Sequence, residues 1–124
     1  MERVRIETFK GKRLVIVDGT DVPADEYTTV LRKGALTVAQ EPLGSVRLVT
    51  VVTRARFGRG TAENVIAYSK TIKPYLKASA VVGLSPLSQV IFWAVKPFAH
   101  KTITSFATLD EAREWLAGFG EVTP

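Results

Sequence analysis

An arginine-rich segment, TRARFGRGT at residues 53–61, is the part of this sequence best suited to chemistry. A guanidinium group binds phosphate and carboxylate through paired hydrogen bonds. The glycines would allow backbone amides to approach an anion closely, and a helix beginning at Thr61 would direct its partial positive charge toward that anion. The segment therefore predicts an anion- or phosphate-binding loop. The alternative is a solvated loop that contacts acidic groups on a partner. The candidate residues are Arg54, Arg56, Gly58, Arg59, Gly60 and Thr61.

A second feature is an apolar helix expected over residues 86–98, LSQVIFWAVKPF after its first proline. Its predicted inner face consists of Leu87, Val90, Ile91, Ala94, Val95 and Phe98. Phe92 and Trp93 would then lie on other faces, beside Lys96. A helix that is apolar nearly all round usually has a second partner. Three partners are considered for it: the last helix with Trp115, a second copy of the chain, and an apolar ligand or membrane surface.

Most catalytic and metal-binding chemistry lacks suitable residues in this chain. The sequence contains no cysteine and a single histidine, His100. Disulfides, thiolate metal sites and a cysteine nucleophile are thereby excluded. Asp18 and Asp21 fit a turn and a helix cap better than a catalytic carboxylate pair. We therefore predict no catalytic residues, no metal and no cofactor, and a protein that is not an enzyme.

The composition is that of a globular domain. The chain has 124 residues, of which 46% are hydrophobic and 23% charged, with a net charge of +5. No apolar run approaches the length of about 18 residues that a membrane-spanning helix needs, and the N-terminus does not resemble a secretory signal. These features predict a cytoplasmic protein. The positive charge could attract nucleic acid, but no basic recognition helix or row of stacking aromatics accompanies it.

Hydrophobic periodicity and turn residues divide the chain into nine elements. The expected strands are residues 3–9, 13–18, 46–52, 78–84 and 103–106. The expected helices are residues 23–40, 61–76, 86–98 and 109–118. Asp21, Thr61, Ser85 and Thr108 are the expected N-caps, the last with Glu111 in a capping box. Residues 1–124 should form one domain, with residues 120–124 frayed.

This element order, ββαβαβαβα, predicts an α/β fold. The first two strands should form an antiparallel hairpin, and sequential right-handed β-α crossovers should complete a mixed five-stranded sheet. Residues 46–52 and 78–84 are apolar on both faces. Such strands lie in the middle of a sheet that is covered on both sides. We therefore expect the first helix, a dimer mate or a ligand to cover the second face.

The second half of the chain is similar to a known group of domains. The segments KPYLKASAVVGLSPL, QVIFWAVKPFAHK and FATLDEAREWL resemble the STAS / CRAL-TRIO-like superfamily, which includes small bacterial sporulation-antagonist-like proteins. The resemblance is specific over residues 73–116 and extends to the first half mainly in element order. It implies a STAS-like domain. One line of the superfamily regulates partner proteins, and the other binds lipids or other apolar molecules.

The resemblance also implies a place for regulation. STAS proteins carry a phosphorylated Ser or Thr in an Asp-Ser-Ser/Thr-Gly-like loop after the third strand. Here Thr53 or Thr61 would occupy that place, but the loop lacks the acidic residue and the serine pair. We therefore expect a non-enzymatic STAS-like binding or regulatory module that acts through protein contacts, as a homodimer. The alternative is a carrier or sensor of a lipid or other apolar small molecule whose anionic head group lies near the arginines.

Overall fold

The structure, a computed structural model, describes residues 2–99 and 102–120 of the chain. The strands are β1 (Val4–Phe9), β2 (Lys12–Asp18), β3 (Val46–Val51), β4 (Leu76–Val82) and β5 (Ile103–Phe106). The helices are α1 (Ala24–Val38), α2 (Thr61–Ile72), α3 (Pro86–Val95) and α4 (Leu109–Gly118), and short 3-10 turns at Lys73–Tyr75 and Lys96–Phe98 extend α2 and α3. This order confirms the predicted ββαβαβαβα arrangement. His100, Lys101 and, of the expected frayed end at residues 120–124, residues 121–124 lie outside the described residues.

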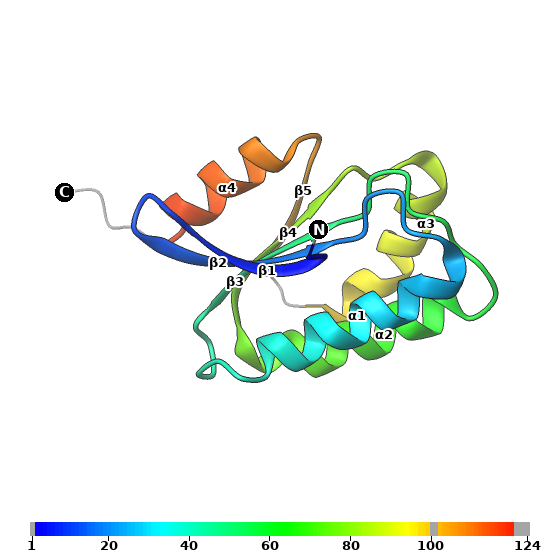
Figure 1. The fold of residues 1–124 in the computed structure, drawn as a ribbon, viewed down its shortest axis with the longest axis horizontal. Helices are drawn as coiled ribbons and strands as arrows, with labels where there is room; N and C mark the ends of the chain where they lie inside the picture. The colour runs from blue at the N-terminus through cyan, green and yellow to red at the C-terminus, as the bar shows by residue number, and fades with distance from the viewer. Residues whose placement is uncertain (1, 100–101, 121–124) are drawn as a thin grey trace.

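The five strands form one mixed sheet, seen nearly edge-on in Figure 1. Their order across the sheet is β1-β2-β3-β4-β5. β1 and β2 are antiparallel, and every later neighbour is parallel. Lys10 and Gly11 join the hairpin with φ angles of 50° and 78°. Two consecutive positive φ angles match the right-handed twist of the flanking strands, which is why such two-residue turns are common in hairpins. The predicted fold class is confirmed.

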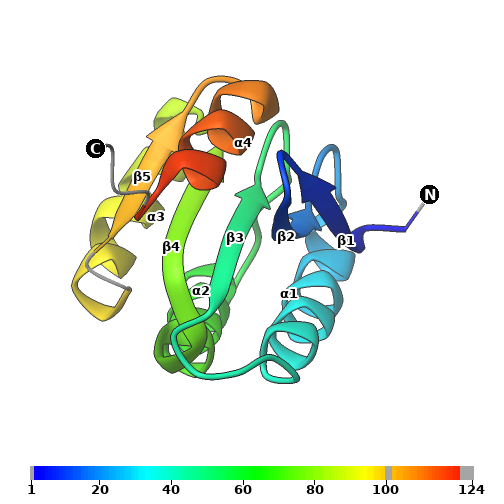
Figure 2. The same ribbon diagram turned by 90° about the vertical axis from the view of Figure 1, so that its left-hand side faces the viewer.

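The sheet is covered on both faces, and the second face is covered by α4. Helices α1, α2 and α3 lie on one face, whereas α4 alone lies on the other (Figure 2). Ala112 and Leu116 of α4 are buried against a core cluster that includes Leu14, Ile16 and Val49. The sequence prediction named three covers for this face and omitted α4.

The expected two-sided apolar strand β3 has one charged exception. Arg47 is buried on the face that α4 covers. Its guanidinium donates hydrogen bonds to the carbonyl oxygens of Leu116 at 3.1 Å and Phe119 at 3.3 Å. Carbonyl groups at the end of a helix have no partner within the helix and carry partial negative charge. Arg47 therefore fastens the end of α4 to the sheet.

Two of the predicted N-caps are wrong. Pro23 occupies the N-cap position of α1 without a side-chain cap, while Asp21 has a φ angle of 57° outside the helix. Gly60 is the N-cap of α2, and Thr61 is the first helical residue. The predicted caps at Ser85 and Thr108 are confirmed, each within a capping box.

The predicted inner face of α3 is also partly wrong. Leu87, Val90 and Ala94 are exposed, whereas Ser88 and Val95 are buried. Apolar residues surround this helix on nearly all sides, so the sequence pattern could not indicate which side meets the sheet.

Close packing between α1 and the sheet requires glycine at position 34. A Cβ atom at Gly34 would lie 2.7 Å from Cγ2 of Val17, a buried residue of β2. We expect Gly34→Ala to destabilise the protein by about 1–2 kcal/mol, because overpacking outweighs the gain in helix propensity. Gly118→Ala is the matched control, since nothing lies within 4 Å of a Cβ atom there. Urea unfolding should show unchanged or higher stability for Gly118→Ala; equal stability for both variants would contradict the packing argument.

Candidate functional site

The carboxyl edge of the parallel strands brings three loops together. The amide of Asp21 donates to the carbonyl of Thr53 at 2.9 Å, and the amide of Arg56 donates to the carbonyl of Val22 at 2.9 Å. At Gly83, which follows β4 with a φ angle of 84°, a Cβ atom would collide with Thr53. The arginine-rich loop is therefore held between the β2–α1 turn and the end of β4, at the edge where open α/β sheets usually bind ligands.

Arg54 is already paired within this edge. Its Nε and Nη2 atoms donate to the two carboxylate oxygens of Asp21 at 2.7 and 3.0 Å. The hydrogen bond from Arg54 lowers the pKa of the Asp21 carboxyl group, and the same bond raises the pKa of Arg54. The charge of Arg54 is therefore matched locally, and the arginine cluster predicted from the sequence is smaller than expected.

Arg56 and Arg59 are the other two arginines of the loop. Both are exposed, and neither forms an ion pair with another described residue. The amide of Gly58, expected to approach an anion, instead donates to the hydroxyl oxygen of Thr61 at 2.8 Å. Thr61 is buried, which also removes its hydroxyl from the surface. Of the six residues predicted for the anion site, the structure leaves these two guanidinium groups available for an anion.

Phe57 connects this loop to a cavity that is partly open to the surface. Its ring meets the ring of Tyr27 edge-on, with 5.4 Å between centroids. Both residues line a cavity of about 70 Å³ between the sheet and helices α2 and α3. The partly exposed residues Leu84 and Ile91 also line it, so the cavity lies directly beneath the surface between the loop and α3. The sequence analysis missed this cavity because its lining residues come from several elements far apart in the chain.

The cavity wall is apolar and uncharged. None of the residues that line it is acidic or basic. Tyr68 and Thr50 share a hydrogen bond of 3.1 Å on this wall. Burial raises the pKa of Tyr68 to about 12 and also raises the pKa of Tyr27. Both phenols therefore stay neutral at physiological pH, and the site can hold a neutral group without an opposing charge.

The outward face of α3 forms a separate apolar surface. Leu87, Val90 and Trp93 are 61%, 66% and 64% exposed, respectively. The Nζ atom of Lys96 lies 4.7 Å from the centroid of the Trp93 ring, a distance at which the ring attracts the cation. We name Leu87, Val90 and Trp93 the α3 patch.

The other predicted interface residues do not join this patch. Phe92 is partly buried and lines the cavity. Trp115 packs against Phe106 and Phe119 beneath α4, on the opposite face of the sheet. The suggested contact between Trp93 and Trp115 is therefore wrong, because the two helices cover different faces.

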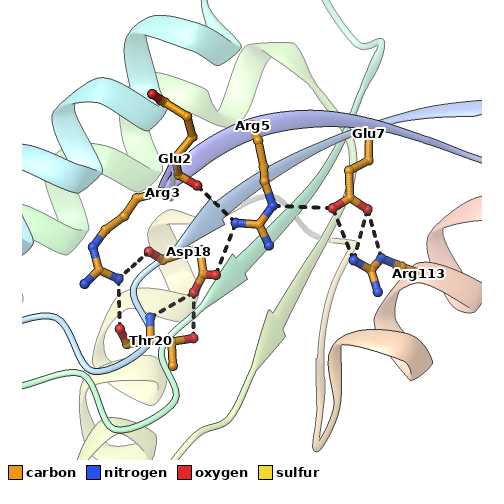
Figure 3. A network of polar contacts seen from close by, with 7 residues as sticks. All are labelled: Glu2, Arg3, Arg5, Glu7, Asp18, Thr20 and Arg113. Carbon is orange, nitrogen blue, oxygen red and sulfur yellow. Dashed lines mark hydrogen bonds and ion pairs between the residues drawn. The ribbon is translucent and has the colours of Figure 1, made fainter.

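A polar network crosses from the N-terminal strand to the β2–α1 turn (Figure 3). Asp18 Oδ1 accepts hydrogen bonds from the amide and hydroxyl of Thr20 at 2.9 and 2.6 Å, and Oδ2 accepts one from Arg5 at 3.2 Å. Arg3 donates to the carbonyl oxygens of Asp18 and Thr20. These contacts give Asp18 a structural role in shaping the turn.

The network continues to α4. Glu7 accepts hydrogen bonds from Nε and Nη2 of Arg113 at 3.1 and 3.2 Å, and its carboxylate also pairs with Arg5. The network joins β1 to α4, and its charged side chains Arg5, Glu7, Asp18 and Arg113 are paired with one another.

Over the described residues, no helix is long and apolar enough to cross a membrane. No group of three or more acidic or histidine side chains within residues 2–99 and 102–120 is placed to hold a metal ion.

Comparison with known proteins identifies the fold. No family model and no curated protein matches the sequence. Among solved structures, the chain is similar to an anti-sigma-factor antagonist (STAS) domain protein from Planctomyces limnophilus, with a TM-score of 0.62 and 13% sequence identity. The match covers 92% of this chain and 97% of the other. The chain therefore has a STAS-domain fold, as the sequence resemblance predicted.

The Asp18 network predicts a pH-dependent contribution to stability. Burial would raise the pKa of Asp18, but hydrogen bonds from Thr20 and Arg5 outweigh it and lower the pKa below its ordinary value of 3.8. A carboxyl group with a lowered folded-state pKa stabilises the fold above its unfolded pKa and loses that effect as the pH falls. We expect Asp18→Asn to cost about 1–3 kcal/mol at pH 7.

The difference between the parent and Asp18→Asn should shrink as the pH falls through the folded-state pKa, which lies below 3.8. Urea unfolding at several pH values measures it. Asp25→Asn, at an exposed position in the first turn of α1, is the control and should cost less than about 1 kcal/mol. A pH-independent cost for Asp18→Asn would contradict the role of its charge.

Proposed function

We propose that this protein is a non-enzymatic binding module with a STAS fold, which acts through protein contacts and forms a homodimer through the α3 patch. The observation that carries the proposal is the exposure of three large apolar side chains on one helix, 61% for Leu87, 66% for Val90 and 64% for Trp93. A contiguous apolar patch on a protein surface usually marks an interaction site.

The chemistry of the patch supports a protein partner. Tryptophan residues contribute most strongly where they become fully buried at the centre of an interface. Lys96 lies beside Trp93, where a polar rim would surround the apolar centre. In a symmetric dimer the same surface is used on both copies, and α3 offers a straight apolar face that can pack against its own copy.

The structural neighbour supports a regulatory role. The protein from Planctomyces limnophilus is described as an anti-sigma-factor antagonist domain protein. Modules of this kind work by binding other proteins, which agrees with an exposed apolar helix. Phosphorylation of Thr61 is not part of the proposal, since this residue is buried and its hydroxyl is engaged by Gly58.

Substitution of Trp93 tests the dimer. We expect Trp93→Glu to weaken self-association by at least about 30-fold, because a charge replaces an aromatic anchor worth about 2 kcal/mol or more. Leu36→Glu is the matched control, since Leu36 is 62% exposed on α1, away from the patch. Sedimentation equilibrium measures the dissociation constant. A parent protein that is monomeric at high concentration, or equal effects of both variants, would remove the dimer from the proposal.

A second function, carriage of a small apolar molecule with an anionic group, is favoured by a different observation. Phe57 lines the cavity, and Arg56 and Arg59, which form no ion pair with a described residue, lie on either side of Phe57 in the sequence of the loop. An apolar ligand portion could enter the cavity while its anionic group meets the guanidinium groups at the surface.

Charge reversal in the loop tests this second function. We expect Arg56→Glu/Arg59→Glu to weaken the binding of hexanoate by about tenfold or more, because two charge-assisted contacts are lost. Arg32→Glu/Lys73→Glu changes the net charge equally at exposed positions outside the loop and should leave binding within about twofold. Isothermal titration calorimetry measures both. The same affinity in the two double variants would exclude the loop as the anion site.

A further inference from the structure

The cavity contains two buried hydroxyl groups that have no protein partner. Ser79 is 4% exposed and Ser69 is 8% exposed, and both line the cavity. Neither side chain forms a hydrogen bond with any described residue. Across the described part of the chain, every side-chain oxygen or nitrogen that is sealed from open space has a partner. The oxygens of Ser79 and Ser69 must therefore be open to the cavity.

The position of Ser79 makes its hydroxyl unusual. It lies in the middle of the sheet, in register with Leu48 of β3 and Ile103 of β5. Thr50, two residues beyond Leu48 on the same face, uses its hydroxyl to bond Tyr68, whereas Ser79 has no such partner. In an empty cavity, a hydroxyl without a hydrogen bond would destabilise the fold by about 1–3 kcal/mol. An occupant of the cavity that accepts or donates a hydrogen bond would remove this cost.

Volume and charge limit what this occupant can be. The cavity measures about 70 Å³, less than half the volume of about 150 Å³ of an engineered cavity that binds benzene, whereas a liquid water molecule occupies about 30 Å³. A long acyl chain therefore does not fit entirely within it. No charged side chain lines the wall, so an ion buried there would lack a counter-charge. The buried part of the ligand must be short and neutral.

We propose that the cavity binds the neutral, oxygen-bearing end of a short apolar molecule, an alcohol or carbonyl compound with about three to five buried heavy atoms, and that the hydroxyls of Ser79 and Ser69 hydrogen-bond its oxygen. The proposal rests on the second function above, small-molecule carriage, and assigns the chemistry of the buried ligand portion. The apolar remainder of the wall, which includes Phe92 and Val95, holds the alkyl part.

Three probes of similar size but different chemistry test the proposal. Isopropanol and acetone carry one oxygen, whereas xenon is purely apolar. We expect isopropanol and acetone to shift the amide resonances of Ser69, Ser79 and their neighbours in a saturable manner in two-dimensional NMR titrations. Binding of xenon alone would show a dry apolar void and overturn the role of the hydroxyls. Absence of binding by all three probes would show that water fills the cavity and would overturn the proposal.

Substitution of the serine separates hydrogen bonding from shape. Ser79→Ala should weaken isopropanol binding by about fivefold, the equivalent of one neutral hydrogen bond, while xenon binds at least as tightly as before. Ser105→Ala, at an exposed position on β5, is the matched control and should bind both probes like the parent. Equal isopropanol affinity in Ser79→Ala and the parent would overturn the assignment.

The unliganded stability of Ser79→Ala gives a second readout. Since the hydroxyl has no partner in the protein, its removal should leave the melting temperature unchanged or raise it. A clear decrease would show that the hydroxyl is already satisfied without a ligand, which contradicts the proposal. The experiments also distinguish this proposal from the carrier function. If hexanoate binds while isopropanol and acetone do not, the carrier function is supported, and the proposal that a neutral, oxygen-bearing end of the ligand is buried in the cavity is excluded.

Discussion

The fold depends on how α4 covers the second apolar face of the sheet. β3 and β4 have apolar side chains on both faces of the sheet. Helices α1, α2 and α3, which connect the parallel strands, all lie on one face and therefore cover that face alone. Polar contacts help to hold α4 in place: Arg47 bonds the carbonyl groups at its end, Arg113 bonds Glu7 on β1, and Lys10 of the hairpin turn pairs with Glu114. Because α4 fulfils this role, the domain needs no partner to complete its core.

This arrangement separates the structural surfaces from the available ones. The polar network around Asp18, Glu7 and Arg113 is saturated by contacts within the chain. The α3 patch, the guanidinium groups of Arg56 and Arg59, and the cavity beneath Phe57 all lie on the opposite side or at the carboxyl edge of the sheet. A ligand or partner can therefore bind at these places without disturbing the contacts that hold α4 on the sheet. This separation agrees with the proposed role of a binding module.

Much of the fold could be predicted from the sequence, because local patterns encode it. The nine elements, the hairpin, the parallel order and the capping boxes at Ser85 and Thr108 all follow from periodicity and from residues that act on their immediate neighbours. The cap at Asp21 failed for the opposite reason. Asp21 bonds Arg54, which lies 33 residues away in the chain, and no local pattern records such a contact. The Thr61 hydroxyl does act locally, on the amide of Gly58, but from the first helical position and not from the N-cap.

The sequence by itself determined which residues alternate, where the capping boxes at Ser85 and Thr108 lie and which strands are apolar on both faces. The tertiary structure alone decided that α4 covers the second face of the sheet and that Trp93 and Trp115 lie on opposite faces of it. It also decided that Arg54 is paired with Asp21, whereas Arg56 and Arg59 form no ion pair with a described residue. It also placed Ser69 and Ser79, which the sequence analysis left without a role, on one cavity wall. The physical reason is that periodicity states which residues share a face of an element, whereas only packing decides what that face meets.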